Sequence, residues 1–271
     1  MSFKNIISIH GVPRSGTSWL GQIFDSSPDV RYKFQPLFSY AFKDDIHLNS
    51  NKFDLMKFYT KIYNYTDSFL DQKDKKEAGL YSTFSEKKSI PPFLITKMVR
   101  YHYLIPHLLE TLENIIIIGI IRNPCGVMNS WKNAPREFLE GWIFKNEWRY
   151  AQSMNRFRPE QFFGFNKWKE STKLFLEMKK KYPKRVYLVK YEDLVKNPVK
   201  QTKELFDFCG IDLSEQTTSF INASTSFEQK ESYSVYKGKK DVGDWKEQFD
   251  DEIKNSIFKE LNGTEFEEFL N

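Results

Sequence analysis

The sequence has little cysteine, with two thiols, Cys125 and Cys209, in 271 residues. Two cysteines cannot build a disulfide framework, and free thiols are typical of a reducing compartment. Long apolar runs are also missing, because the longest aliphatic stretch, Ile115 to Ile121, is far too short to cross a bilayer. No secretory leader precedes the first expected strand. We therefore expect a soluble, cytoplasmic protein without a membrane span.

The sequence also lacks a strong excess of one charge. It has 41 Lys and Arg residues against 36 Asp and Glu residues, a formal net charge of +5. This mild excess suits the steering of an anionic cofactor or acceptor, but it does not by itself indicate nucleic acid, so no nucleic-acid partner is expected. Aromatic residues are abundant, at 17% of the chain. We expect them to pack the core and to line a cleft.

Short apolar strands alternate with helical patterns along the chain. Strands are expected at Ile6 to Ile9, Val30 to Phe34, Phe93 to Val99, Ile115 to Ile121 and Val186 to Val189. Helices are expected at Ser18 to Phe24, Phe53 to Leu70, Tyr103 to Leu112, Arg136 to Arg156, Lys167 to Lys181 and Val199 to Phe208. The alternation predicts an α/β fold with a central parallel sheet flanked by helices.

A glycine-bearing turn, GVPRSGTS from Gly11 to Ser18, separates the first expected strand from the first helix. In this context the backbone N–H groups converge and the following helix presents its positive end to an anion. The spacing matches a phosphate-binding P-loop, but Thr17 stands at the lysine position and the basic residue is Arg14. The turn therefore predicts a site for a diphosphate-like group.

Two departures argue against a nucleotide triphosphatase or a kinase. Such enzymes use the missing lysine to bridge phosphates and a carboxylate after a second strand to hold magnesium. Here the strand that ends at Ile121 is followed by Arg122, a cation. We expect a site that needs no metal.

Five segments, in order, resemble PAPS-dependent sulfotransferases, where PAPS is 3′-phosphoadenosine 5′-phosphosulfate. PRSGTSWL (Pro13 to Leu20) looks like the 5′-phosphosulfate loop, and IIRNPCGVMNSW (Ile120 to Trp131) looks like the 3′-phosphate segment. VKYEDLVKNP, TSF and YKGKKDVGDWK, which begin at Val189, Thr225 and Tyr236, resemble later elements; the last two are typical of the cytosolic branch. The resemblance implies a single domain over residues 1–271 with a three-layer P-loop-type fold. Residues of about 40–90 and 133–165 would be insertions on the acceptor side.

The resemblance also implies which residues bind PAPS. Arg14 and its neighbours would hold the 5′-phosphosulfate, Arg122 and Ser130 the 3′-phosphate, and Trp19 would stack on adenine. Lys97 matches a lysine that touches the transferring sulfuryl group. Further positions on the loop, near adenine or near the 3′-phosphate are Ser15, Gly16, Thr17, Ser18, Tyr191, Thr225, Phe227, Lys237, Gly238 and Lys239.

The general base matches neither family template. The cytosolic branch has a histidine two residues after the lysine, where this chain has Val99, and carbohydrate sulfotransferases have a glutamate where this chain has Gln35. Gln35 cannot accept a proton at neutral pH, but it can hydrogen-bond the acceptor. We therefore predict His102, close to Lys97, as the base. After it we rank His47, His10 and a carboxylate such as Glu140.

Three functions compete. The sequence favours in-line sulfuryl transfer from PAPS to a hydroxyl or amine of a small-molecule, saccharide or lipid acceptor. Gln35 and Val99 instead suit a non-catalytic PAPS-binding module, and a P-loop kinase is the least favoured. A homodimer is a further possibility that the sequence leaves open.

Overall fold

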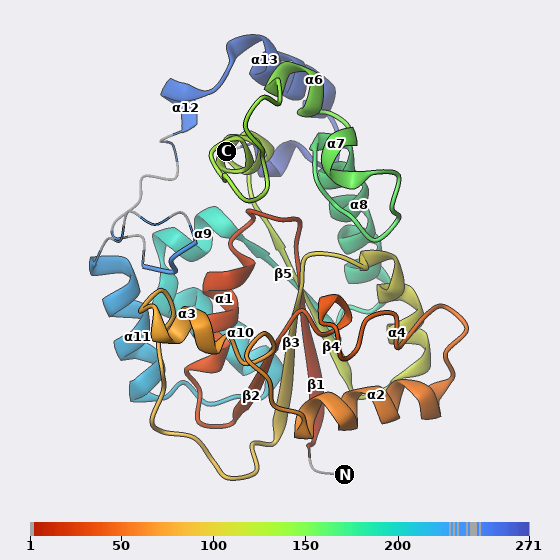
Figure 1. Ribbon diagram of the computed structural model, residues 1–271, viewed down its shortest axis with the longest axis vertical. Coiled ribbons are helices and arrows are strands. Elements are labelled where there is room, and N and C mark those ends of the chain that lie inside the picture. The colour runs from red at the N-terminus through yellow and green to blue at the C-terminus, as the bar shows by residue number, and fades with distance from the viewer. Residues whose placement is uncertain are drawn as a thin grey trace.

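A five-stranded parallel sheet forms the centre of the protein (Figure 1). The computed structural model describes residues 3–227, 229, 231, 233–236, 238, 243 and 245–270. The strand order is β2-β3-β1-β4-β5, and every neighbouring pair is parallel. The strands are β1 (Asn5–His10), β2 (Val30–Phe34), β3 (Phe93–Met98), β4 (Ile115–Ile121) and β5 (Val186–Lys190). All five lie where the sequence predicted strands.

Successive residues of each strand face opposite sides of the sheet, so the core is divided into two clusters. In β4, Ile115, Ile117 and Ile121 belong to one cluster, whereas Ile118 and Ile120 belong to the other. A strand that is apolar at every position is what two covered faces require. The unbroken isoleucine run therefore encodes a central strand with helices on both sides.

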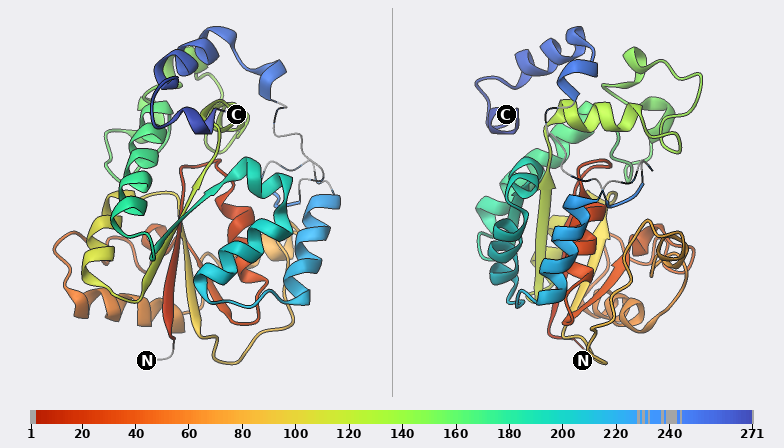
Figure 2. Two further views of the ribbon diagram at one scale, coloured as in Figure 1. Left: turned by 180° about the vertical axis from the view of Figure 1, so that it is seen from behind. Right: turned by 90° about the vertical axis from the view of Figure 1, so that its left-hand side faces the viewer.

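Helices cover both faces of the sheet, which gives three layers (Figures 1 and 2). One core cluster joins the sheet to α1 (Thr17–Asp25), α9 (Tyr191–Lys196), α10 (Pro198–Cys209) and α11 (Glu215–Ser226). The other joins it to α2 (Lys52–Asn64), α4 (Ile105–Thr111) and α8 (Phe165–Lys181). The short α3 (Lys73–Glu77) lies beside α1 in Figure 1. The predicted three-layer α/β fold is confirmed.

A group of short elements lies beyond the carboxyl ends of the strands (Figures 1 and 2). These elements are α5 (Pro124–Lys132), α6 (Phe144–Glu147), α7 (Gln152–Asn155), α12 (Trp245–Gln248) and α13 (Asp251–Leu261). Ligands of open α/β sheets bind at this end of the strands. These elements are therefore placed to line a ligand-binding site at the carboxyl ends of the strands.

Two predicted helices are wrong in extent. Arg136 to Arg156 is not one long helix, because Gly141 and Ala151 have positive φ values of 85° and 48°, which interrupt a right-handed helix. The helix predicted to reach Leu70 ends at Asn64, after which Tyr65 is extended. The polar stretch that follows folds into turns in which the Asp67 carboxylate accepts a hydrogen bond from the Leu70 N–H.

Within the described residues, no helix combines the length and the apolar character that a bilayer crossing demands.

Candidate active site

A cavity of about 480 Å³ opens at the carboxyl ends of the strands. Its walls come from the β1–α1 loop, the ends of β2, β3 and β4, and parts of α5, α9 and α11. Five of the described residues that line it are basic: Arg14, Lys75, Lys97, Arg100 and Arg122. Among the described lining residues, Glu137 is the one carboxylate, and no histidine is present. A cavity with this excess of positive charge suits a polyanionic ligand.

The β1–α1 loop has the backbone of an anion cradle. Gly16, the residue before α1, has φ of +94°, and a Cβ on it would lie 2.5 Å from the Tyr191 ring. Arg14 also has a positive φ, 74°, which is uncommon for a residue with a side chain. The loop thus requires glycine at position 16, which is what a phosphate-binding turn before a helix needs.

The Ser15 side chain serves the loop itself. Its hydroxyl donates to the Val12 carbonyl oxygen over 2.6 Å, and the residue is fully buried. It does not line the cavity, whereas Thr17 and Ser18 do. The Ser15 N–H also donates to the Val12 carbonyl oxygen, over 3.2 Å, so both donors of this residue serve the loop.

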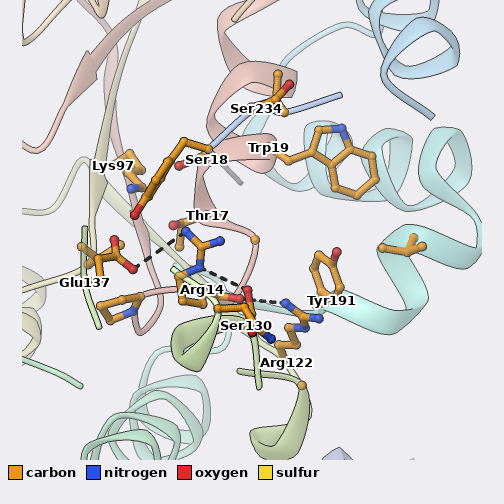
Figure 3. A pocket seen from close by; sticks show the side chains of 18 of the residues that line it. Arg14, Thr17, Ser18, Trp19, Lys97, Arg122, Ser130, Glu137, Tyr191 and Ser234 are labelled. Carbon is orange, nitrogen blue, oxygen red and sulfur yellow. Dashed lines mark hydrogen bonds and ion pairs between the residues drawn. The ribbon is translucent and has the colours of Figure 1, made fainter. Parts of the chain in front are cut away.

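The 3′-phosphate candidates lie together on the β4 side of the loop. Arg14 Nε donates to Ser130 Oγ over 3.1 Å, and Arg122 Nη1 donates to the Arg14 carbonyl oxygen over 3.1 Å (Figure 3). The Arg122 guanidinium also lies 4.6 Å from the centre of the Tyr191 ring. Segments more than 100 residues apart in the chain therefore meet at one polar corner.

The adenine-side candidates are partly brought together. Trp19 Nε1 donates to Ser224 Oγ over 2.9 Å, and Thr225 lines the same wall although its hydroxyl donates to the Ile221 carbonyl oxygen. Phe227 is 58% exposed and does not line the cavity. Gly238 does, while Lys237 and Lys239 lie outside the described residues.

Lys97 and Gln35 line the cavity on the other side of the loop. Lys97 Nζ lies 4.5 Å from the centre of the Phe34 ring, and the residue is only 3% exposed. Burial, followed by the charge of Lys75, holds the pKa of Lys97 well below its ordinary value. A bound anion beside Lys97 would favour its charged form.

His102 lies outside the cavity, in the core. It is fully buried, its Nδ1 lies 3.0 Å from Nδ1 of His10, and its ring packs against Phe162 and Phe175. Burial, followed by the charge of His10, holds the pKa of His102 well below its ordinary value. Its position argues against the predicted role of base.

Strand register explains this placement. Ile9 pairs with Lys97, and His10 pairs with Met98 one residue later. The His10 and Lys97 side chains therefore face opposite sides of the sheet. His102 joins His10 on the side away from Lys97. His47 and Glu140, which are both exposed, do not line the cavity either.

Glu137 is the lining residue that the sequence reasoning missed. Its Oε2 lies 3.8 Å from Arg14 Nη1, and this oxygen is buried without a hydrogen-bond partner among the described residues (Figure 3). Its carbonyl oxygen accepts from Trp131 Nε1 over 2.9 Å, which fixes the backbone there. The mistaken long helix concealed Glu137, because a helix gives no reason to turn this particular carboxylate inward.

The sequence profile of the sulfotransferase family matches residues 7–215. The chain belongs to the sulfotransferase family. A carbohydrate sulfotransferase 1 from Danio rerio aligns with this family member over 83% of the chain at 24% identity; the alignment spans 66% of that relative's own length.

Solved structures agree with the fold of this family member. A mouse sulfotransferase complexed with PAP, which is 3′-phosphoadenosine 5′-phosphate, superposes with a TM-score of 0.57 at 18% identity. This superposition covers 99% of this chain and 90% of that one. A retinol dehydratase in complex with androsterone and inactive cofactor PAP superposes with a TM-score of 0.57 at 17% identity. This superposition covers 97% of this chain and 82% of that one. Both likenesses support the P-loop-like three-layer fold.

Proposed function

We propose that this protein transfers a sulfuryl group from PAPS to a hydroxyl or amine of an acceptor. The observation that carries the proposal is the meeting of Arg14, Arg122 and Ser130 at one corner of a cationic cavity. An arginine fork and a hydroxyl are apt partners for a terminal phosphate. Membership of the family, and relatives solved with the product nucleotide PAP, support the same ligand.

The cavity residues fit this donor. The Gly16 turn leaves no room for a side chain and offers N–H groups to the 5′-phosphosulfate, with Arg14, Thr17 and Ser18 beside it. Arg122 and Ser130 would hold the 3′-phosphate, and Trp19, which lines the cavity, would stack on adenine. Gly238, Tyr191 and Thr225, which line the cavity, complete this assignment, and Ser15, Phe227, Lys237 and Lys239 remain predictions. When bound, PAPS would supply the sulfuryl group and depart as PAP.

Arg14 and Lys97 would stabilise the charge that develops during transfer. Arg14 is fixed by the hydrogen bond from its Nε to Ser130, and Lys97 is held against the Phe34 ring. Donors that are already oriented cost little reorganisation, so they usually supply the largest catalytic contribution. Gln35 lines the same side and would orient the acceptor through its amide.

Glu137 is the group we propose as general base in place of His102. Its buried Oε2 lacks a hydrogen-bond donor among the described residues, and such an oxygen costs free energy until a donor arrives. An acceptor O–H or N–H would provide that donor and pass its proton to Oε2. A positioned base typically contributes 10²–10⁴-fold to the rate.

The acceptor side would be built from the two insertions. Lys75 and Tyr81 line the cavity from the first, and Glu137 and Phe163 from the second. The carbohydrate sulfotransferase relative favours a saccharide acceptor, although the two chains share only part of their length. A cytoplasmic location, a homodimer and a single domain over residues 1–271 remain predictions.

Thermal unfolding with nucleotides tests the function. PAP should stabilise the protein much more than adenosine 5′-phosphate, because a ligand that binds the native state at about 100 times its Kd adds roughly 2.7 kcal/mol. Equal shifts of the unfolding temperature with the two nucleotides would contradict the proposed 3′-phosphate site. Mass gain of an acceptor from a mixed saccharide, lipid and phenol panel with PAPS would then separate an enzyme from a binding module.

A further inference from the structure

The strand order divides the cavity into two halves. The β1–α1 loop lies at the centre, with β4 and β5 on one side and β3 and β2 on the other. Arg122 and Tyr191 follow β4 and β5, whereas Lys97 and Gln35 lie at the ends of β3 and β2. Figure 3 shows Trp19 and Tyr191 on one side of the loop, and Lys97 and Glu137 on the other. We call the β2–β3 side the acceptor half.

The acceptor half contains more cations than the donor would require. Arg14 and Arg122 belong to the proposed PAPS-binding corner, and Lys97 would face the sulfuryl group. Lys75 and Arg100 also line the cavity, and neither has a carboxylate within ion-pair distance among the described residues. Lys75 donates to the hydroxyl of Tyr81 over 3.2 Å and lies 5.1 Å from the centre of the Phe34 ring.

Arg100 is held in one orientation by neutral partners. Its Nε donates to Gln161 Oε1 over 2.9 Å, its Nη1 donates to Gln35 Oε1 over 3.0 Å, and its guanidinium lies 4.0 Å from the centre of the Phe38 ring. The residue is only 9% exposed. Two of its five N–H groups are used in these bonds, and no described residue accepts from Nη2.

No carboxylate pairs directly with Arg100 or Lys75 among the described residues. Glu137 acts electrostatically on both Arg100 and Lys97, and Glu160 acts on Arg100, but the one ion pair of Glu137 among these residues is with Arg14. Burying a guanidinium without a counter-charge is costly, so a fixed, buried and unneutralised fork is the mark of an anion site. Gln35 and Gln161 position the fork without neutralising it.

We propose that Arg100, assisted by Lys75, binds a carboxylate or sulfate group of the acceptor, so that the acceptor is an anionic alcohol or amine. The proposal rests on the proposed function, because it takes the acceptor to be the second ligand of the cavity. Glu137 would receive the proton of the reacting group while Arg100 holds the anion. The planar fork of Arg100 suits a two-oxygen anion better than a point charge does.

Matched probes test this subsite. Protein saturated with PAP is titrated calorimetrically with methyl β-D-glucuronide against methyl β-D-glucoside, and with 4-hydroxybenzoate against 4-hydroxybenzyl alcohol. At least one carboxylate should bind about tenfold or more tightly than its neutral partner, a preference worth about 1.4 kcal/mol. Arg100→Gln should abolish that preference, and Lys75→Met should reduce it. Arg156→Gln, which removes an exposed guanidinium outside the cavity, should leave it unchanged.

Three results would overturn the subsite. They are the absence of a carboxylate preference in both pairs, a preference that survives in Arg100→Gln, and a loss of PAP affinity in Arg100→Gln as large as the loss of preference. The thermal shift with PAP checks that each variant is folded. If PAP fails to bind the wild-type protein, the proposed function itself fails, which is distinct from any of these outcomes.

Discussion

Arg14 and Ser130 are 116 residues apart in the chain, and the Nε of the first donates to the hydroxyl of the second over 3.1 Å. This bond joins the β1–α1 loop to α5, so the two predicted phosphate-binding segments form one unit. The carbonyl oxygen of Arg14 also accepts from Arg122, so three residues of two segments share one hydrogen-bond network.

Ser130→Ala removes a 3′-phosphate donor and the acceptor of the Arg14 Nε hydrogen bond. We expect PAP affinity to fall by roughly 10- to 100-fold, since a hydrogen bond to a charged group is worth roughly 1.5–3 kcal/mol. Affinity for adenosine 5′-phosphate should change much less. Ser153→Ala, outside the cavity, is the control, and calorimetric titration is the measurement. Equal losses for both nucleotides would remove the special role of Ser130.

Glu137→Gln keeps the shape of the side chain but cannot accept the acceptor proton. Turnover of any acceptor found in the panel should fall by about 10²-fold or more, while PAP affinity is kept or increases, because a carboxylate beside Arg14 has been neutralised. Glu140→Gln, an exposed neighbour, should behave as wild type. Wild-type turnover in Glu137→Gln would exclude it as the base.

His10 and His102 should make stability depend on pH. Burial lowers the pKa of His10 to about 3 and holds that of His102 well below its ordinary value, so both bind a proton more tightly in the unfolded chain. Their contribution is fully present above pH 6.5 and is lost as the pH falls below it, by up to about 1.4 kcal/mol per pH unit for each histidine. Urea unfolding between pH 7 and 5 measures this slope.

A variant at His102 separates a structural from a catalytic role. His102→Gln should flatten the pH slope and lower stability, with the turnover of the folded fraction close to wild type. A large loss of turnover in fully folded His102→Gln would return it to the catalytic machinery.

Lys97→Met should stabilise the free protein while it abolishes most turnover. The folded state holds the pKa of Lys97 well below its unfolded value, mainly through burial, so the free energy of unfolding should rise by roughly 1 kcal/mol or more at pH 7. This gain should shrink as the pH rises toward about 10.4, where the unfolded lysine also loses its proton. Thermal unfolding at a series of pH values measures it; a destabilised variant would contradict the argument.

Excess EDTA should leave PAP binding and turnover unchanged, because the strand that ends at Ile121 is followed by Arg122. Among the described residues, no group of three His, Cys, Asp or Glu side chains is placed to hold a metal ion. A strict magnesium requirement would favour the kinase alternative.

Local patterns predicted the strands and the phosphate loop. Each of these depends on a short segment whose chemistry and neighbours are close in sequence, such as the isoleucine run of β4. Arg122 and Ser130 were singled out by the resemblance to sulfotransferases, not by a local pattern. The segment at 133–165 could not be predicted in the same way, because its turns depend on positive φ values at residues such as Ala151, which has no sequence preference for them. Glu137 was hidden for that reason.

His102 is separated from the cavity by the side of the sheet on which it lies, not by its distance from Lys97 along the chain. His102 is close to Lys97 along the chain, but the pairing of β1 with β3 fixes which residues face the cavity. Val99 lines it, two residues after Lys97, whereas His10 and His102 are on the other side. Sequence proximity carried no information about this division.

The register of β1 and β3 thus works like a reading frame. The side chains of Ile9 and Lys97 face the cavity side of the sheet, and those of His10 and Met98 face the other side. A single-residue deletion in β3 before Lys97 would therefore turn the lysine into the apolar core on the other side and turn Met98 toward the cavity. An engineer who wished to restore an imidazole to this cavity would leave both native histidines alone. The in-frame position is Val99.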